Sequence, residues 1–135
     1  METRVLQLWW FLPAGYLVTV ALETPVLILG LSARHTLRRK FLSGLWLTAC
    51  TYPVVVIVLP LVFDSSTRLA YLVAAETFAP IAECALFWAA FSGDGRDGRE
   101  RAFPCRDFAA IIGANLLSFA LGELLNLYGW FGVLG

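Results

Sequence analysis

Four long apolar stretches restrict the folds that this chain can adopt. They cover about residues 8–31, 41–62, 69–91 and 108–127 of the 135-residue sequence. Each stretch matches the length of about 20 residues that an α-helix needs to cross the hydrocarbon core of a bilayer. Their apolar residues do not alternate with a period of two, which excludes the strands of a membrane β-barrel. The pattern predicts an all-α, polytopic membrane protein whose four transmembrane helices form a single transmembrane domain over residues 1–135.

The amino-acid composition supports the same class of protein. Hydrophobic residues make up 59% of the chain and charged residues 15%, whereas soluble domains have about 45–50% and about 25%. Ten Lys and Arg balance ten Asp and Glu, so the net charge gives no reason to expect a nucleic-acid partner. The composition excludes a large soluble enzyme and makes the lipid bilayer the expected partner.

Lys and Arg are unevenly distributed among the connections, which predicts the orientation of the helices. Eight of the ten lie in residues 32–40 and 92–107. Cytoplasmic loops of membrane proteins carry an excess of these residues. We therefore predict a multi-pass protein of the bacterial inner (cell) membrane, with loops 32–40 and 92–107 in the cytoplasm and both termini on the outer side.

The two halves of the chain are similar to each other. Glu23–Ser32 aligns with Glu83–Ser92, and after seven additional residues Arg39–Phe41 aligns with Arg106–Phe108. Two similar hairpins that enter from the same side form a parallel internal repeat of the kind found in some transporters. The alignment predicts a four-helix bundle built from two similar hairpins that arose by duplication. Alternatively, the two hairpins are similar only because a four-helix bundle uses the same type of hairpin twice. Further along the alignment, Thr48 matches Asn115, Thr51 matches Ser118 and Tyr52 matches Phe119.

Each predicted helix carries a polar stripe, because residues three, four or seven apart share one face of a helix. Lipid cannot hydrogen-bond these side chains, so the four stripes are expected to face one another inside a bundle. Alternatively, their hydroxyl and amide groups only hold the helices together. Gly44 and Gly122 are expected to allow close helix packing. The stripes comprise Tyr16, Thr19 and Glu23; Gly44, Thr48 and Thr51; Glu76, Pro80 and Glu83; and Asn115, Ser118, Gly122 and Asn126, with Glu123 at the edge.

Four prolines interrupt the first three predicted helices: Pro25, Pro53, Pro60 and Pro80. Each proline lacks an N–H group and therefore frees a backbone carbonyl of its helix. The freed carbonyls either join the oxygen groups of the polar stripes or accompany kinks that only shape the bundle.

Four glutamates lie within the predicted spans, and no Lys, Arg or His lies there to pair with them. An ionised carboxylate at the centre of a bilayer costs at least about 2.5 kcal/mol. Each of these acids must therefore be protonated, hydrogen-bonded, hydrated or bound to a cation. Hard cations and protons prefer oxygen ligands, which the polar stripes supply.

We predict two layers of functional residues from their positions along the helices. The inner layer is a cation- or proton-binding site of Glu23 and Glu83, assisted by Thr48, Asn115, Thr51 and Ser118. The outer layer is a relay of Glu76, Glu123 and Tyr16. The identity of any bound metal is left open.

Three functions are compatible with buried carboxylates. The first is a carrier or channel-like protein that moves a small cation or protons; because four helices enclose little space, a homodimer or larger membrane complex is then expected. The second is a non-catalytic membrane subunit or assembly factor in which the acids are structural. The third is an intramembrane enzyme that uses paired carboxylates as acid and base on a lipid-like substrate.

Cysteine and histidine give no indication of a cofactor. Cys50, Cys84 and Cys105 form no CxxC pair and have no metal-ligand spacing. His35 is the only histidine and lies in the first predicted loop. Haem ligation and Ser-His-Asp chemistry inside the bundle are therefore excluded, and no cofactor is expected.

The polar pattern resembles that of small, uncharacterised bacterial inner-membrane proteins with four helices. It consists of Glu23-x-Pro25, Thr48-x-x-Thr51-Tyr52-Pro53, Glu76-x6-Glu83 and Asn115-x-x-Ser118-x3-Gly122. The resemblance covers all four spans, has Thr48 where an Asn is expected, and implies no activity. The size is also similar to that of the small multidrug transporters, which use a single Glu in their first helix. Four acids and strongly biased loop charges disfavour an antiparallel dimer of that kind.

Overall fold

The computed structural model describes residues 2–63, 67–91 and 105–128. Within these ranges all regular structure is helical. The predicted all-α class with four long helices is therefore confirmed. The elements are α1 (Glu2–Gly30), α2 (Leu37–Pro53), a π-helical turn η1 (Val54–Val58), α3 (Leu59–Val62), α4 (Arg68–Phe91) and α5 (Cys105–Leu127).

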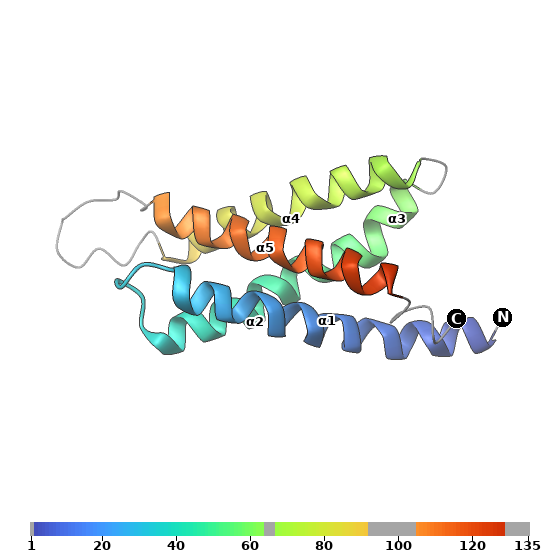
Figure 1. Cartoon of the computed structure of the whole chain (residues 1–135), viewed down its shortest axis with the longest axis horizontal. Helices are drawn as coiled ribbons and strands as arrows, with labels where there is room; N and C mark the ends of the chain where they lie inside the picture. Colours follow the sequence, from blue (N-terminus) through green and yellow to red (C-terminus); the bar gives the residue numbers. More distant parts are fainter. Residues whose placement is uncertain (1, 64–66, 92–104, 129–135) are drawn as a thin grey trace.

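The four long helices pack as an elongated bundle (Figure 1). Both α1 and α4 contact α2 and α5, so α2 and α5 bridge the other two helices. The turn between α1 and α2, the last turn of α4 and the first turn of α5 lie at one end, which we call the His35 end. The start of α4 and the last turn of α5 lie at the opposite end, which we call the Arg68 end.

The bundle is apolar outside and partly polar inside. Leu29 on α1 is 80% exposed, whereas Thr48 and Glu83 are buried. Lipid solvates apolar side chains and cannot hydrogen-bond polar ones, so this arrangement suits a bilayer. Four segments are long and apolar enough to cross a membrane, and they imply contact with a lipid bilayer: Leu12–Gly30, Leu37–Val62, Arg68–Phe91 and Cys105–Leu125.

Prolines affect the helices unequally. Helix α1 continues past Pro25 and α4 past Pro80, whereas the second span changes to a π-helical turn directly after Pro53. In that turn Leu59 N–H donates to the carbonyl of Val54, five residues earlier. The next residue that could donate in this i to i+5 pattern is Pro60, opposite the carbonyl of Val55, but proline has no N–H. The hydroxyl of Tyr71 on α4 donates to this carbonyl instead, at 3.0 Å.

The two glycines that were expected to allow close packing differ. A Cβ added at Gly44 collides with the Oγ1 of Thr24 and lies 3.2 Å from its Cα, so α1 and α2 cross closely there. A Cβ added at Gly122 meets nothing within 4 Å. The prediction is confirmed for Gly44 and wrong for Gly122.

Two cations close the carboxyl end of α1, where the last helical carbonyls have no partner in their own helix. Lys40 Nζ donates to the carbonyls of Ile28 at 3.3 Å and Leu31 at 2.9 Å. Arg106 Nε donates to the carbonyl of Gly30 at 2.8 Å, and its Nη2 donates to that of Leu29 at 3.4 Å. These basic residues therefore stabilise the helix end in addition to any effect on orientation.

Candidate functional site

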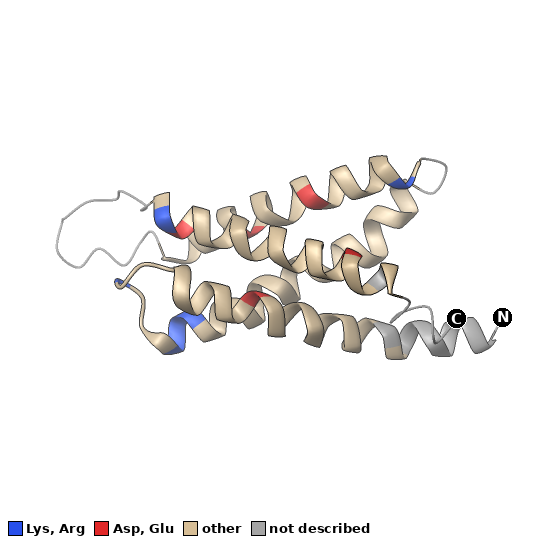
Figure 2. Cartoon of the chain, in the orientation of Figure 1, with Lys and Arg blue, Asp and Glu red and all other residues tan. Residues whose placement is uncertain are grey.

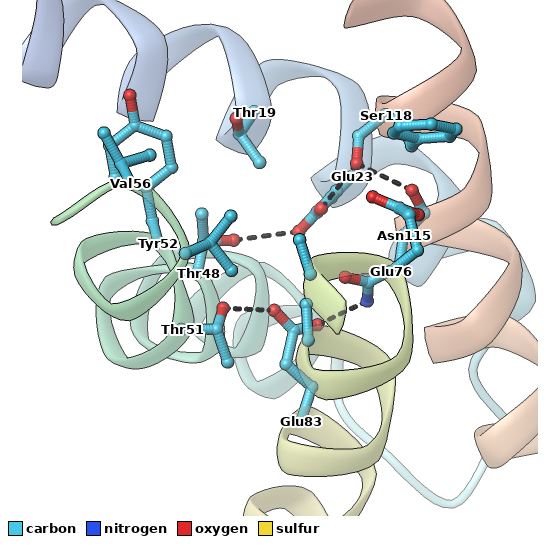
Figure 3. A pocket seen from close by; sticks show the side chains of 14 residues that line it. Thr19, Glu23, Thr48, Thr51, Tyr52, Val56, Glu76, Glu83, Asn115 and Ser118 are labelled. Atoms are coloured by element: carbon cyan, nitrogen blue, oxygen red, sulfur yellow. Dashed lines mark hydrogen bonds between the residues drawn. The ribbon is translucent and has the colours of Figure 1, made fainter. Parts of the chain in front are cut away.

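Two glutamates lie at the centre of the bundle, Glu23 from α1 and Glu83 from α4 (Figure 3). Both are buried, with 3% and 2% of their surface exposed. Each oxygen of Glu23 accepts one hydrogen bond: Oε2 from the hydroxyl of Thr48 at 2.9 Å and Oε1 from that of Ser118 at 2.7 Å. The donors come from α2 and α5, which lie on either side of α1.

Glu83 also accepts one hydrogen bond on each oxygen, from side chains of the same two helices, α2 and α5. Its Oε1 accepts from the hydroxyl of Thr51 on α2 at 2.7 Å. Its Oε2 accepts from Nδ2 of Asn115 on α5 at 2.7 Å. The structure therefore brings together all six residues predicted for the inner layer.

The three hydroxyl groups can form hydrogen bonds with the carboxyl groups whether these are ionised or protonated. Thr48, Thr51 and Ser118 each also lie 2.8–3.1 Å from a carbonyl of their own helix. A hydroxyl has one proton to donate and two lone pairs that accept. It donates to an ionised carboxylate, or accepts from a protonated one and turns its proton to the helix carbonyl. No buried donor is then left without an acceptor in either state.

Asn115 differs from the hydroxyl groups because its amide nitrogen carries two protons. Nδ2 donates to Glu83 Oε2 and, at 3.0 Å, to the carbonyl of Ile111. The amide nitrogen bonds to both acceptors at once, so rotation of the amide would gain no hydrogen bond. On Glu83 this leaves Oε1, which faces Thr51, as the oxygen that can carry a proton.

A cavity of about 160 Å³ lies beside the two glutamates. A water molecule occupies about 30 Å³ in the liquid, so the cavity has room for several. Glu76 lines its wall, two helical turns from Glu83, and has no hydrogen-bond or ion-pair partner among the described residues. The lining residues are Thr19, Glu23, Thr48, Thr51, Tyr52, Val55, Val56, Ala75, Glu76, Ala79, Glu83, Asn115, Ser118 and Phe119.

The other two residues predicted for the relay have partners elsewhere. The hydroxyl of Tyr16 donates to the carbonyl of Leu45 at 2.8 Å. Glu123 accepts two hydrogen bonds from Arg68 Nη2, at 3.0 and 2.9 Å. Neither Tyr16 nor Glu123 is among the described residues that line the cavity. Arg68 is the first residue of α4 and directly precedes the predicted third span, so it does not count among the cations inside the spans. Figure 2 shows Lys and Arg near the helix ends, whereas Asp and Glu also lie along the helices.

The Arg68–Glu123 pair is expected to contribute little to stability. The side chain of Arg68 is 62% exposed, and exposed pairs contribute about 0–1 kcal/mol. We expect Arg68→Ala to lower the free energy of unfolding by less than about 1 kcal/mol, measured by denaturant titration in detergent micelles. A larger loss would mean that the pair is desolvated in the folded protein.

A second buried polar cluster lies at the His35 end and was not predicted. Asp107 in the first turn of α5 is fully buried. Its Oδ1 accepts from Ser32 N–H at 2.7 Å, and its Oδ2 accepts from the Ser32 hydroxyl at 3.2 Å and from His35 Nε2 at 2.9 Å. We call these three residues the Asp107 clasp. The serine hydroxyl contacts the aspartate rather than the histidine, so the group is not ordered as a Ser-His-Asp triad.

The sequence contains one signal for this cluster. Asp107 is the last residue of the predicted loop 92–107, just before the predicted start of the last helix. The alignment of the two halves nevertheless pairs Asp107 with Lys40 and Arg106 with Arg39. A single acid therefore stands among basic residues at the start of a helix, where the helix dipole favours negative charge.

The chain has no significant match among protein-family models, curated proteins or solved structures. Among the described residues, no three His, Cys, Asp or Glu side chains are grouped so that they could hold a metal ion. Fold and site together define a membrane protein with four candidate spans and buried acids, Glu23, Glu83 and Asp107, in polar networks.

Proposed function

We propose that this protein binds protons or a small cation at Glu23 and Glu83 and moves them through the centre of the bundle. The observation that carries the proposal is the pairing of two buried glutamates with hydroxyl donors that fit both the charged and the protonated carboxyl group. The adjoining cavity has room for water molecules or a small ion. Buried ionisable groups that face a cavity inside a membrane bundle commonly mark ion or proton pathways.

Protons are the favoured cargo. Every oxygen of the two carboxyl groups already accepts a hydrogen bond from the protein. A proton adds to such a group by reversal of one hydroxyl, whereas a metal ion must compete with the donors. Thr48, Thr51, Ser118 and Asn115 act as positioning residues for the two glutamates.

Glu76 is the best candidate for the relay between this centre and the Arg68 end. It lines the cavity and lies two turns nearer that end than Glu83 on the same helix. Glu123 and Tyr16, which we had expected in the relay, have other partners in Arg68 and Leu45. We therefore assign the relay to Glu76 alone.

The hydrogen bonds also support duplication of an ancestral hairpin. In the alignment of the two halves, the bond from Thr48 to Glu23 corresponds to that from Asn115 to Glu83. The bond from Ser118 to Glu23 likewise corresponds to that from Thr51 to Glu83. One pair of bonds to backbone carbonyls also corresponds in the alignment, since Thr48 bonds to Gly44 and Asn115 to Ile111. This pseudo-twofold pattern supports corresponding roles for the two glutamates in the two hairpins.

The function is tested by reconstituting the purified protein into liposomes and measuring proton uptake with an internal pH-sensitive dye. An imposed potassium diffusion potential supplies the driving force. Glu23→Gln and Glu83→Gln should each reduce the uptake about tenfold or more, because an amide cannot take up a proton at neutral pH. Replacement of sodium in the buffers, with the potassium gradient kept, distinguishes proton movement from that of sodium.

Glu123→Gln is the matched control, since it makes the same change in a span at a residue outside the cavity. It should retain most of the uptake. Unchanged uptake in both Glu23→Gln and Glu83→Gln would rule out the proposed function, as would equal losses in all three variants.

A structural role in a larger membrane complex is the second candidate. Its supporting observation is that all four oxygens of Glu23 and Glu83 are capped by donors, as in a purely structural polar network. This role predicts a stoichiometric partner in mild detergent extracts and full partner binding by the glutamine variants. Purification of the chain alone in a monodisperse state would argue against it.

A further inference from the structure

An apolar cluster lies on one side of the cavity. It comprises Leu27, Leu31, Leu47, Phe87, Ala110, Ile111 and Ala114. On every long helix its members lie nearer the His35 end than the residues that line the cavity. Glu23 is followed by Leu27 on α1, and Glu83 by Phe87 on α4. The cluster therefore separates the glutamates from the His35 end.

The cluster is densely packed. Leu31, Leu47, Phe87 and Ile111 have no exposed surface. Leu31 directly follows α1, and the other three come from α2, α4 and α5, so their side chains meet across the section of the bundle. An apolar constriction excludes water and ions even without a charged barrier. In this conformation the cluster closes the path from the cavity to the His35 end.

The Asp107 clasp lies directly beyond this cluster. Asp107 belongs to α5, whereas Ser32 and His35 belong to the turn between α1 and α2, so the clasp joins the two hairpins. The His35 ring packs edge-to-face on Phe87 of the cluster, with 5.0 Å between ring centroids, and also contacts Phe91. Separation of the hairpins at this end requires the clasp to break.

We propose that the apolar cluster is a closed gate and that the Asp107 clasp is its latch. In the described conformation the glutamates are reached from the Arg68 end, and release of the clasp opens the opposite path. The gate rests on the proposed function, because alternating access to a central site is what transport requires. Beyond the proposed function, the gate specifies the end of the bundle from which Glu23 and Glu83 are reached. It also specifies the residues that keep the opposite end closed.

Sided labelling of a cysteine in the cavity tests the gate without any measurement of transport. The three native cysteines are replaced by Ala or Ser, and Ala79→Cys places one thiol on the cavity wall. A charged, membrane-impermeant thiol reagent is added to vesicles of either orientation. The thiol should react from the Arg68 side and about tenfold or more slowly from the His35 side.

Release of the clasp should abolish this difference. Asp107→Asn and, as a milder change, His35→Ala should each raise the labelling rate from the His35 side about tenfold. Circular dichroism and size-exclusion chromatography establish that the variants fold. Arg68→Ala, which breaks a bond between α4 and α5 at the other end, is the control and should leave the sidedness unchanged.

The gate is rejected if the parent protein is labelled equally from both sides or from neither. It is also rejected if both folded clasp variants keep the original sidedness. One-sided labelling together with normal uptake in the Glu23→Gln and Glu83→Gln variants rejects the proposed function and leaves the closed cluster intact. Loss of uptake in those variants with two-sided labelling rejects the gate alone.

Discussion

Asp107→Ala is expected to lower the free energy of unfolding by about 2–5 kcal/mol, because each buried donor that is left without its acceptor costs about 1–3 kcal/mol. The substitution removes an acceptor that is fully buried. It leaves the N–H of Ser32 and Nε2 of His35 without the partners they have at 2.7 and 2.9 Å. The midpoint of unfolding in a denaturant titration in detergent micelles measures the loss.

The control for this prediction is Glu123→Ala, which removes an acid that is partly exposed and paired with Arg68. It should cost less than about 1 kcal/mol, because exposed ion pairs contribute little. Equal losses in the two variants would mean that the Asp107 clasp is no more important to the fold than an exposed ion pair.

Gly44→Val is expected to destabilise the bundle by about 3 kcal/mol, at the upper end of the range for overpacked cores. The added Cβ collides with the side chain of Thr24 and lies 3.2 Å from its Cα, which is backbone and cannot move without shifting α1. Because α1 carries Glu23, a shift of this helix should also reduce proton uptake. Thermal unfolding in detergent measures the first effect, and the liposome assay measures the second.

Gly122→Val is the matched control, since nothing lies within 4 Å of a Cβ at that position. It should leave the unfolding midpoint nearly unchanged. Thr24→Ala should restore only part of the stability of Gly44→Val, because it removes the hydroxyl contact but not the contact with Cα. A Gly44→Val protein as stable as the parent would show that α1 and α2 do not cross closely in the membrane.

The residues of the site could be predicted because of a strong physical constraint on the helices. A hydroxyl, amide or carboxyl group in a membrane helix must face protein rather than lipid. The spacing of Glu23, Thr48, Thr51, Glu83 and Asn115 therefore placed them in the interior, where the structure has them. The same constraint applies less strongly near the helix ends, where water is close. The sequence pattern therefore did not indicate that Glu123 pairs with Arg68 or that Asp107 contacts Ser32 and His35.

The contacts themselves could not be predicted, because they depend on the rotation and crossing of the helices. Gly44 and Gly122 both occupy polar stripes, but only Gly44 lies where two helices cross closely. Pro53 and Pro25 both follow a polar residue within a span, but only Pro53 is followed by a π-helical turn.

By itself the sequence determined the class of protein, the four spans and the six central polar residues. Length, apolar composition and helical periodicity are enough for these, because the bilayer permits few ways to bury polar groups. Only the tertiary structure decided which donor meets which carboxylate oxygen, that the apolar cluster lies between the cavity and the His35 end, and that Asp107 joins the two hairpins. These features arise where residues distant in the chain come within about 3 Å, and such distances are determined by packing rather than by composition or periodicity.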